Sequence, residues 1–281
     1  MGKVTIHILR CGTIELNEGA VIGGKPGPAG MLLGAASRPK KRVCLPCFCY
    51  LIEHPQGLFL VDTGIGRAFS PGGLFDPSSS AKLIGKTLCA FLRPRVDPGM
   101  SISEQLEKRG IKPHDIDILI LSHLDADHVG GLHELRGVRR ILLPEDEYFW
   151  SCRAVYKARQ PQSLWIDMPI ERFWYRGSAL GTNRWAFDVL GDDSLVAVNL
   201  PGHTDGLCAL LVRNGKRYVC LASDSALCRE NIETVTVPGF CFDEKLAKKA
   251  LLYLRAMRED PDCTDILLSH DRSETRDSIF L

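Results

Sequence analysis

The stretch Ser122-His123-Leu124-Asp125-Ala126-Asp127-His128 decides how this chain is interpreted, because it follows directly on an apolar run at residues 116–121 that predicts a buried strand. A turn and the first winding of a helix can point several of its side chains into one cavity. Imidazole and carboxylate are the ligand types that suit zinc, iron or manganese, and bridging carboxylates allow two ions to be held. Gly130-Gly131 follows and permits close backbone packing behind the cluster. The stretch predicts a metal centre at a strand end.

The plainer alternative is an Asp-rich turn that caps a helix, with Asp125 or Asp127 as the N-cap and the histidines solvated. Against it stand further ligand-type residues, each at the end of another predicted strand. They are His203 after residues 196–200, Asp224 after residues 218–222 and His270 after residues 266–268. Such ends are where α/β folds keep their sites, so one shared centre is expected.

Composition narrows the class of protein. The chain has 281 residues, of which 45% are apolar and 25% charged, as in proteins with a substantial core. Lys plus Arg is 35 against 34 for Asp plus Glu, so a net charge of +1 gives no reason to expect nucleic acid as a partner. No apolar run approaches the ~20 residues that span a bilayer, and no signal peptide is evident. We expect a cytoplasmic protein with no membrane partner.

The eleven cysteines are an odd number, scattered through a chain too large to need disulfide staples. Cys44 and Cys47 have the Cys-x-x-Cys spacing that can hold zinc, but no second pair with matching spacing follows. We therefore expect Cys44, Cys47 and Cys49 to be small strand residues with free thiols.

One domain over residues 1–281 is expected, because strand-like segments recur along the chain without an internal repeat. Strands are predicted at residues 4–9, 44–53, 57–62, 116–121, 141–143, 196–200, 207–212, 218–222 and 266–268, and helices at residues 103–109 and 244–258. A Gly- and Pro-rich stretch near residues 19–42 predicts a surface excursion that could border the site. An aromatic segment near residues 145–176 is a candidate cap that lines a substrate pocket.

The motifs together resemble those of the metallo-β-lactamase superfamily, over nearly the whole chain. They are Asp62-Thr63-Gly64, His123-x-Asp125-x-Asp127-His128, Pro201-Gly202-His203-Thr204, Ser223-Asp224 and Ser269-His270. Residues 8–12 and 45–51 resemble, within that superfamily, the N-acyl homoserine lactonases. The resemblance implies a four-layered αβ/βα sandwich in which two mixed sheets face each other between outer helices, with the metals at one edge.

The resemblance also implies a role for each motif residue in a dinuclear centre. One metal ion would take His123, Asp125 and His203, the other would take Asp127, His128 and His270, and Asp224 would bridge them. Zinc is the metal that the family favours, with iron or manganese as alternatives. The implied reaction is lactone-ring opening by a metal-bound hydroxide, on an N-acyl homoserine lactone or a related ester, as in quorum quenching; Asp127 would also carry a proton to the leaving alkoxide. The expected partner is this small molecule, and a homodimer is left open.

Two positions depart from the family pattern. The family has His where this chain has Asp125, and an anionic ligand there favours harder ions such as iron or manganese. Flavodiiron proteins also have a carboxylate at this place, but this chain has no room for their flavodoxin domain. Lactonases of the family place a tyrosine three residues after the bridging aspartate, where this chain has Leu227. Tyr148 or Tyr156 would then have to supply the hydrogen-bond donor to the substrate carbonyl.

Two other functions remain open at this point. A phosphodiesterase or nuclease would need cations near the metals, and Arg136, Arg139 and Arg140 form the one obvious cluster. The motif at residues 122–132 also resembles that of competence-type DNA-uptake proteins, although the downstream histidine motif and the balanced charge argue against DNA. The other alternative is an iron-binding redox protein of the same fold, which Asp125 would permit.

Overall fold

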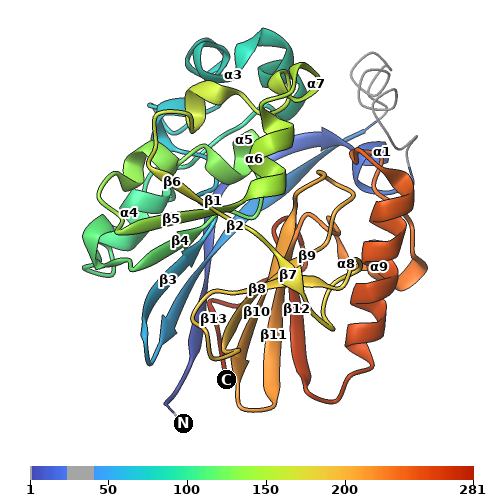
Figure 1. The fold of residues 1–281 in the computed structure, drawn as a ribbon. Helices are drawn as coiled ribbons and strands as arrows, with labels where there is room; N and C mark the ends of the chain where they lie inside the picture. Colours follow the sequence, from blue (N-terminus) through green and yellow to red (C-terminus); the bar gives the residue numbers. More distant parts are fainter. Residues whose placement is uncertain (1, 24–40) are drawn as a thin grey trace.

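Two β-sheets face each other and helices cover their outer sides (Figure 1). The computed structural model describes residues 2–23 and 41–281. The sheet order is β13-β1-β2-β3-β4-β5-β6 in the first sheet and β12-β11-β10-β9-β8-β7 in the second. The four-layered αβ/βα sandwich expected from the motifs is confirmed.

The first sheet is mixed: it is antiparallel from β13 to β3 and parallel from β3 to β6. Its strands are β1 (Thr5–Asn17), β2 (Arg42–His54), β3 (Gly57–Val61), β4 (Ile118–Ile120), β5 (Arg140–Pro144), β6 (Ile170–Phe173) and β13 (Ser278–Phe280). The hairpin expected between β2 and β3 is present, with His54 paired to Gly57.

The second sheet is also mixed. Its strands are β7 (Arg176–Gly177), β8 (Trp185–Asp188), β9 (Leu195–Asn199), β10 (Cys208–Asn214), β11 (Arg217–Ser223) and β12 (Cys263–Leu268). β10 is antiparallel to both β9 and β11, and β11 is parallel to β12. β9, β11 and β12 therefore point in one direction and end at the same edge.

Apolar side chains fill three spaces. One core lies between the sheets, with Ile6, Ile52 and Leu221 among its buried residues. A second packs the first sheet against helices that include α3 (Pro77–Leu92), α4 (Ile102–Glu107) and α5 (Ala126–Val129). A third lies between the second sheet and the helices α8 (Arg229–Thr234) and α9 (Glu244–Arg258). The sandwich is thus closed on both outer sides (Figure 1).

Several local expectations can be compared with these elements. α9 has the bounds expected for it, and α4 covers residues 103–107 of the helix expected at residues 103–109. Of the excursion near residues 19–42, only its ends lie within the described residues, where α1 (Glu18–Val21) and the start of β2 are found. The aromatic segment forms α6 (Glu145–Ser151), α7 (Ala154–Lys157) and β6. Among the residues described, no helix is long and apolar enough to cross a membrane.

Candidate metal centre

The strand directions explain why residues far apart in sequence meet. β3 and β4 are parallel, so Asp62 and His123 follow their carboxyl ends at one edge of the first sheet. His203, Asp224 and His270 follow β9, β11 and β12, whose carboxyl ends share an edge of the second sheet. Backbone bonds join the two sheets here: Cys208 N donates to Ser122 O at 3.1 Å, and Phe48 N donates to Ser269 O at 2.9 Å.

All seven predicted ligands lie in this place, and all are buried. They are His123, Asp125, Asp127, His128, His203, Asp224 and His270. His123, Asp125 and His203 form one group whose ligand atoms lie within 4.8 Å of one another; a second set of this kind is His123, His128 and Asp224. Asp127 and His270 belong to a third. The structure thus brings the seven predicted ligands to one place, but it divides the set expected for the second ion, with His128 in one of these sets and Asp127 and His270 in another.

Asp224 faces imidazoles from both predicted ligand sets. Its Oδ1 is 3.3 Å from His128 Nε2, and its Oδ2 is 3.3 Å from both His203 Nε2 and His270 Nε2. His270 Nε2 is also 3.3 Å from Asp127 Oδ2. One carboxylate that faces imidazoles of both groups has the position that a bridging ligand needs.

Each imidazole is oriented by a bond at its other ring nitrogen. His128 Nδ1 donates to Asp62 Oδ2 at 2.8 Å, His203 Nδ1 to the Phe240 carbonyl at 2.9 Å and His270 Nδ1 to the Pro46 carbonyl at 2.6 Å. His123 Nδ1 lies 3.0 Å from Ser122 Oγ. Such bonds fix the tautomer that leaves the Nε2 lone pair free for a cation.

The backbone at this edge is strained and tightly packed. Asp62 and Ser223 have φ values of 60° and 48°, a left-handed conformation that turns the chain sharply at the strand ends. A Cβ at Gly130 would lie 2.8 Å from the carbonyl oxygen of Gly64, so glycine at this position allows the end of α5 to approach the loop after β3. The close packing expected of Gly130-Gly131 is present.

The donor set fits divalent cations. Nε2 of His123, His128 and His270 and Oδ1 of Asp224 are buried without a hydrogen-bond partner, which is costly unless something else satisfies them. Asp125 does occupy the N-cap position of α5, but its side chain makes no capping bond there. The capping alternative with solvated histidines is therefore wrong, and the buried ligand groups support two divalent ions.

Comparison with known proteins decides the family. The family model described as the metallo-β-lactamase superfamily matches residues 96–270. The chain belongs to the metallo-β-lactamase superfamily. An N-acyl homoserine lactonase of Bacillus cereus is 30% identical over 232 residues, which cover 79% of this chain and 81% of the relative. The expectation of a hydrolase of this superfamily, similar in pattern to these lactonases, is confirmed.

Solved structures of two lactone-hydrolysing enzymes share the fold. One is an N-acyl homoserine lactone hydrolase with N-hexanoyl-L-homoserine at its catalytic metal centre, with a TM-score of 0.74, 23% identity, and coverage of 97% of this chain and 95% of the other. Another is AidC, a dizinc quorum-quenching lactonase in complex with a product, with a TM-score of 0.63, 16% identity, and coverage of 100% and 95%. At these identities the likeness concerns the fold alone.

Arg159 is the first of two residues at this site that the sequence did not predict. It follows α7, is 5% exposed, and lies against the first ligand group. Its Nε donates to both oxygens of Asp125 at 2.8 Å. Burial opposes the charge on Asp125, but Arg159 and the nearby imidazoles outweigh it and hold the pKa of that carboxyl well below its usual range. No local pattern indicates this pair, because 34 residues separate its members.

Glu147, in α6, is a second functional residue that the sequence did not reveal. Its Oε1 accepts from Leu124 N at 3.0 Å and from Gln160 Nε2 at 2.6 Å, and its Oε2 accepts from Thr204 Oγ1 at 2.7 Å. Burial raises its pKa. One side chain therefore ties the loops that carry His123 and His203 to the aromatic segment.

The cysteines behave largely as expected. Cys44 is exposed, Cys47 and Cys49 are buried in β2, and all three are free. Cys47 lies with Asp127 and His270 in the third ligand group, which the sequence did not suggest. Burial raises the pKa of its thiol to about 11, so without a metal it is a neutral neighbour of the second ion's ligands.

Leu227 is buried in an apolar core. It is 1% exposed, belongs to the core between the first sheet and its helices, and its N–H bonds to Asn231 Oδ1. Tyr156 is also buried, and its hydroxyl donates to Asp205 Oδ2 at 2.6 Å. Tyr148 is half-buried, with its ring 5.7 Å from that of Trp165. Of the two tyrosines considered as substitute donors, Tyr156 is already engaged.

The arginines that a phosphodiesterase would need are each paired with a carboxylate. Arg136 pairs with Asp167, Arg139 Nη1 with Asp117 Oδ1 at 2.5 Å, and Arg140 Nη2 with Glu171 Oε2 at 2.7 Å. All three are exposed. His133, close by, pairs with the same Asp167 at 2.9 Å. These are solvated surface pairs, so they give no cationic patch for a phosphate.

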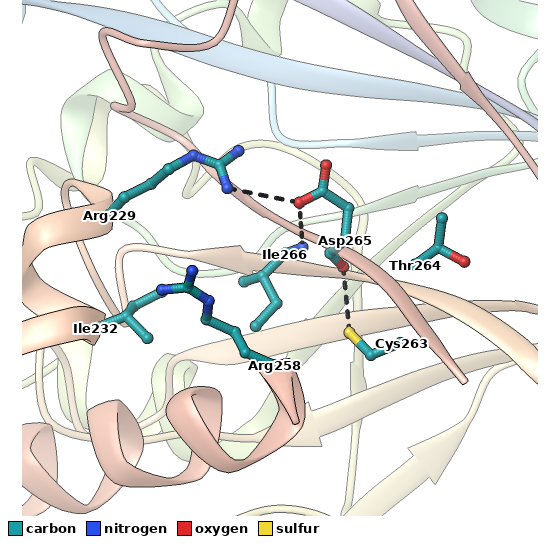
Figure 2. A pocket seen from close by; sticks show the side chains of 7 residues that line it. All are labelled: Arg229, Ile232, Arg258, Cys263, Thr264, Asp265 and Ile266. Atoms are coloured by element: carbon teal, nitrogen blue, oxygen red, sulfur yellow. Dashed lines mark hydrogen bonds and ion pairs between the residues drawn. The ribbon is translucent and has the colours of Figure 1, made fainter. Parts of the chain in front are cut away.

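A pocket of about 210 Å³ lies elsewhere, between α8, α9 and the amino-terminal half of β12 (Figure 2). Arg229 and Arg258 line it, and each is paired: Arg229 Nη1 lies 3.7 Å from Asp265 Oδ1, and Arg258 Nη1 lies 3.2 Å from Glu233 Oε1. His270 follows the other end of β12. This pocket is separate from the metal centre.

Proposed function

We propose that this chain opens the ring of a lactone, or cleaves a related carboxylic ester, at a centre of two divalent cations. The observation that carries the proposal is the set of oriented imidazoles whose buried Nε2 atoms face Asp224 without a hydrogen-bond partner. The lactonase relatives support lactones as the substrate class, with N-acyl homoserine lactones as the named case and quorum quenching as the resulting role. A cytoplasmic location and a homodimer stay predictions.

The chain's own residues would hold and use the ions in distinct ways. One ion would be held by His123, Asp125 and His203. The other would be held by Asp127, His128 and His270, and Asp224 would bind both ions. Two such cations lower the pKa of water enough to supply a nucleophile at neutral pH and polarise the ester carbonyl. Asp127 is 7% exposed, the highest exposed fraction among the seven, and its carboxylate would carry the proton to the leaving alkoxide.

Substrate preference follows from the missing phenol. A single oxyanion donor is worth about 3 kcal/mol in the transition state, and Leu227 cannot supply one. Because the hydroxyl of Tyr156 is bonded to Asp205, Tyr148 is the better candidate of these two tyrosines for a substitute donor. We therefore expect weak turnover of simple N-acyl homoserine lactones and a preference for another lactone or ester.

Zinc is the proposed metal, with iron and manganese as the alternatives that Asp125 favours. Metal content measured together with the absorbance spectrum separates a zinc hydrolase from an iron redox protein. The phosphodiesterase alternative loses its main support, because Arg136, Arg139 and Arg140 are paired on the surface.

The test is a panel of lactones, thioesters and phosphodiesters, assayed on protein of known metal content. We expect ring opening of at least one lactone, and no phosphodiester cleavage. The proposal would be contradicted if the protein cleaved only phosphodiesters. It would also be contradicted if protein that holds both ions turned over no substrate of the panel. Changing Tyr148 to Phe tests the substitute donor: an unchanged rate, together with efficient turnover of acyl-homoserine lactones, would show that no phenol is needed.

A further inference from the structure

Arg159 holds the atoms that the first metal ion would use. Its Nε donates to Asp125 Oδ1 and Oδ2, and its Nη2 lies 2.6 Å from Asp125 Oδ2. The same Nη2 lies 2.6 Å from His203 Nε2, while its Nη1 donates to the His203 carbonyl at 2.9 Å. The guanidinium also lies 4.4 Å from the centre of the Phe240 ring. Arg159 is therefore part of the ligand site and is held there by several contacts.

The contact with His203 excludes a metal ion at the same time. His203 Nδ1 donates to the Phe240 carbonyl, so Nε2 holds the ring's one remaining lone pair. Arg159 Nη2 donates to that lone pair. A zinc ion on this atom would sit at about 2.0–2.1 Å along the same direction. The guanidinium and the ion therefore cannot share His203.

The second group, here the ligands expected for the second ion (Asp127, His128 and His270, with Asp224), has no such competitor. His128 Nε2, His270 Nε2 and Asp224 Oδ1 are buried and lack hydrogen-bond partners, whereas His203 Nε2 and both oxygens of Asp125 have them. Charge strengthens the contrast: Arg159 neutralises Asp125, while Asp127 and Asp224 face imidazoles. Cation binding at the second group gains full ligation without displacing a bond to arginine.

We propose that Arg159 competes with a divalent cation for the first ligand group, so that the second group fills first and the first fills only when the guanidinium is displaced. This inference rests on the metal centre of the proposed function. It assigns Arg159 a regulatory role, as an internal counter-ion that sets how much metal the chain needs before its centre is complete. A cation that binds the first group must replace the buried bidentate pair between Arg159 and Asp125. We therefore expect the affinity of the first site to be on the order of 100-fold weaker than that of the second.

The test is zinc binding by the full chain, followed by competition with a chromophoric chelator and by metal analysis after dialysis against buffered zinc. Wild type should bind about one ion tightly and a second on the order of 100-fold more weakly. Arg159→Met should bring the two affinities within about tenfold of each other. The matched control is Lys157→Met, which removes an exposed positive charge two residues away and should leave both affinities unchanged.

Arg159→Met leaves Asp125 buried without its cation, so the zinc-free variant can fold poorly. Arg159→Lys is the second variant, because it keeps the charge but loses the bidentate contact; it should strengthen the first site by a smaller factor. Zinc should raise the Tm of either variant more than that of wild type. Two results would contradict the proposed competition. One is that wild type binds two ions tightly and the variants bind them with unchanged affinities; the other is that the variants lose the first ion. Failure of all forms to bind zinc would instead count against the proposed function.

Discussion

Asp62→Asn tests how the second ion's ligands are held. Asp62 is buried and accepts three bonds: Ser122 N on Oδ1 at 2.8 Å, and on Oδ2 both Ser122 Oγ at 2.7 Å and His128 Nδ1 at 2.8 Å. An amide has one oxygen, so at least one of these buried donors must meet an NH₂ group. If the oxygen keeps His128, the N–H of Ser122 is unsatisfied. If it keeps Ser122 N, His128 loses the bond that fixes its tautomer.

Both arrangements have a measurable cost. One unsatisfied buried donor destabilises a fold by about 2 kcal/mol, which for a chain of this length lowers Tm by about 4 °C. Loss of the partner that orients a metal-binding imidazole weakens metal affinity about 10- to 100-fold. Thermal unfolding in chelator measures the first effect, and zinc competition measures the second.

Asp117→Asn is the matched control. Asp117 also accepts a backbone N–H, from Leu58 at 2.9 Å, but it precedes β4, at the end of the strand away from the metal centre. It should lower stability without changing zinc affinity. The reasoning is refuted if Asp62→Asn binds zinc like wild type, or if both variants weaken zinc equally.

Three further changes test other parts of the structure. Asp224→Ala should lose one or both metal ions and most activity, whereas His133→Ala, at an exposed ion pair, should be nearly silent in the same assays; equal effects would mean that the ligand assignment is wrong. Leu227→Tyr should lower the free energy of unfolding by about 1–3 kcal/mol through overpacking, and a gain in lactone turnover would show that this side chain does reach the substrate. Hydrogen bonds from Arg67 lower the pKa of Glu104 to about 2 against burial, so this carboxylate stabilises the fold above pH 4.5, and the stabilisation is lost as pH falls from there toward 2. For a partly exposed pair we expect Glu104→Gln to cost about 1 kcal/mol at pH 7 and less at pH 3, by chemical denaturation; a gap that is constant with pH would contradict this.

The strand ends of the site were predictable from the sequence, because each apolar run is followed at once by a ligand-type residue. His123, His203, Asp224 and His270 are all found where these runs place them. The helix at α9 was also predictable, since Asp243 caps its first turn and apolar residues recur at helical spacing.

α3 was not foreseen, although Asp76 and Pro77 are good starting signals, because Gly85 interrupts it with a φ of 78° and breaks the helical period. Arg159 and Glu147 could not be foreseen for a different reason. Their partners lie in other elements, so their roles arise only when the aromatic segment folds over the metal loops. The long β1, which continues past Gly12 to Asn17, also depends on its distant pairing with β2.

The most direct test of the account is to count the metal ions and measure lactone ring opening on the same sample. Protein prepared without chelator and then saturated with zinc should contain about two ions per chain, and its ring-opening activity should disappear on chelation and return with the metal. A content well below one ion per chain that zinc, iron and manganese all fail to raise would contradict the account.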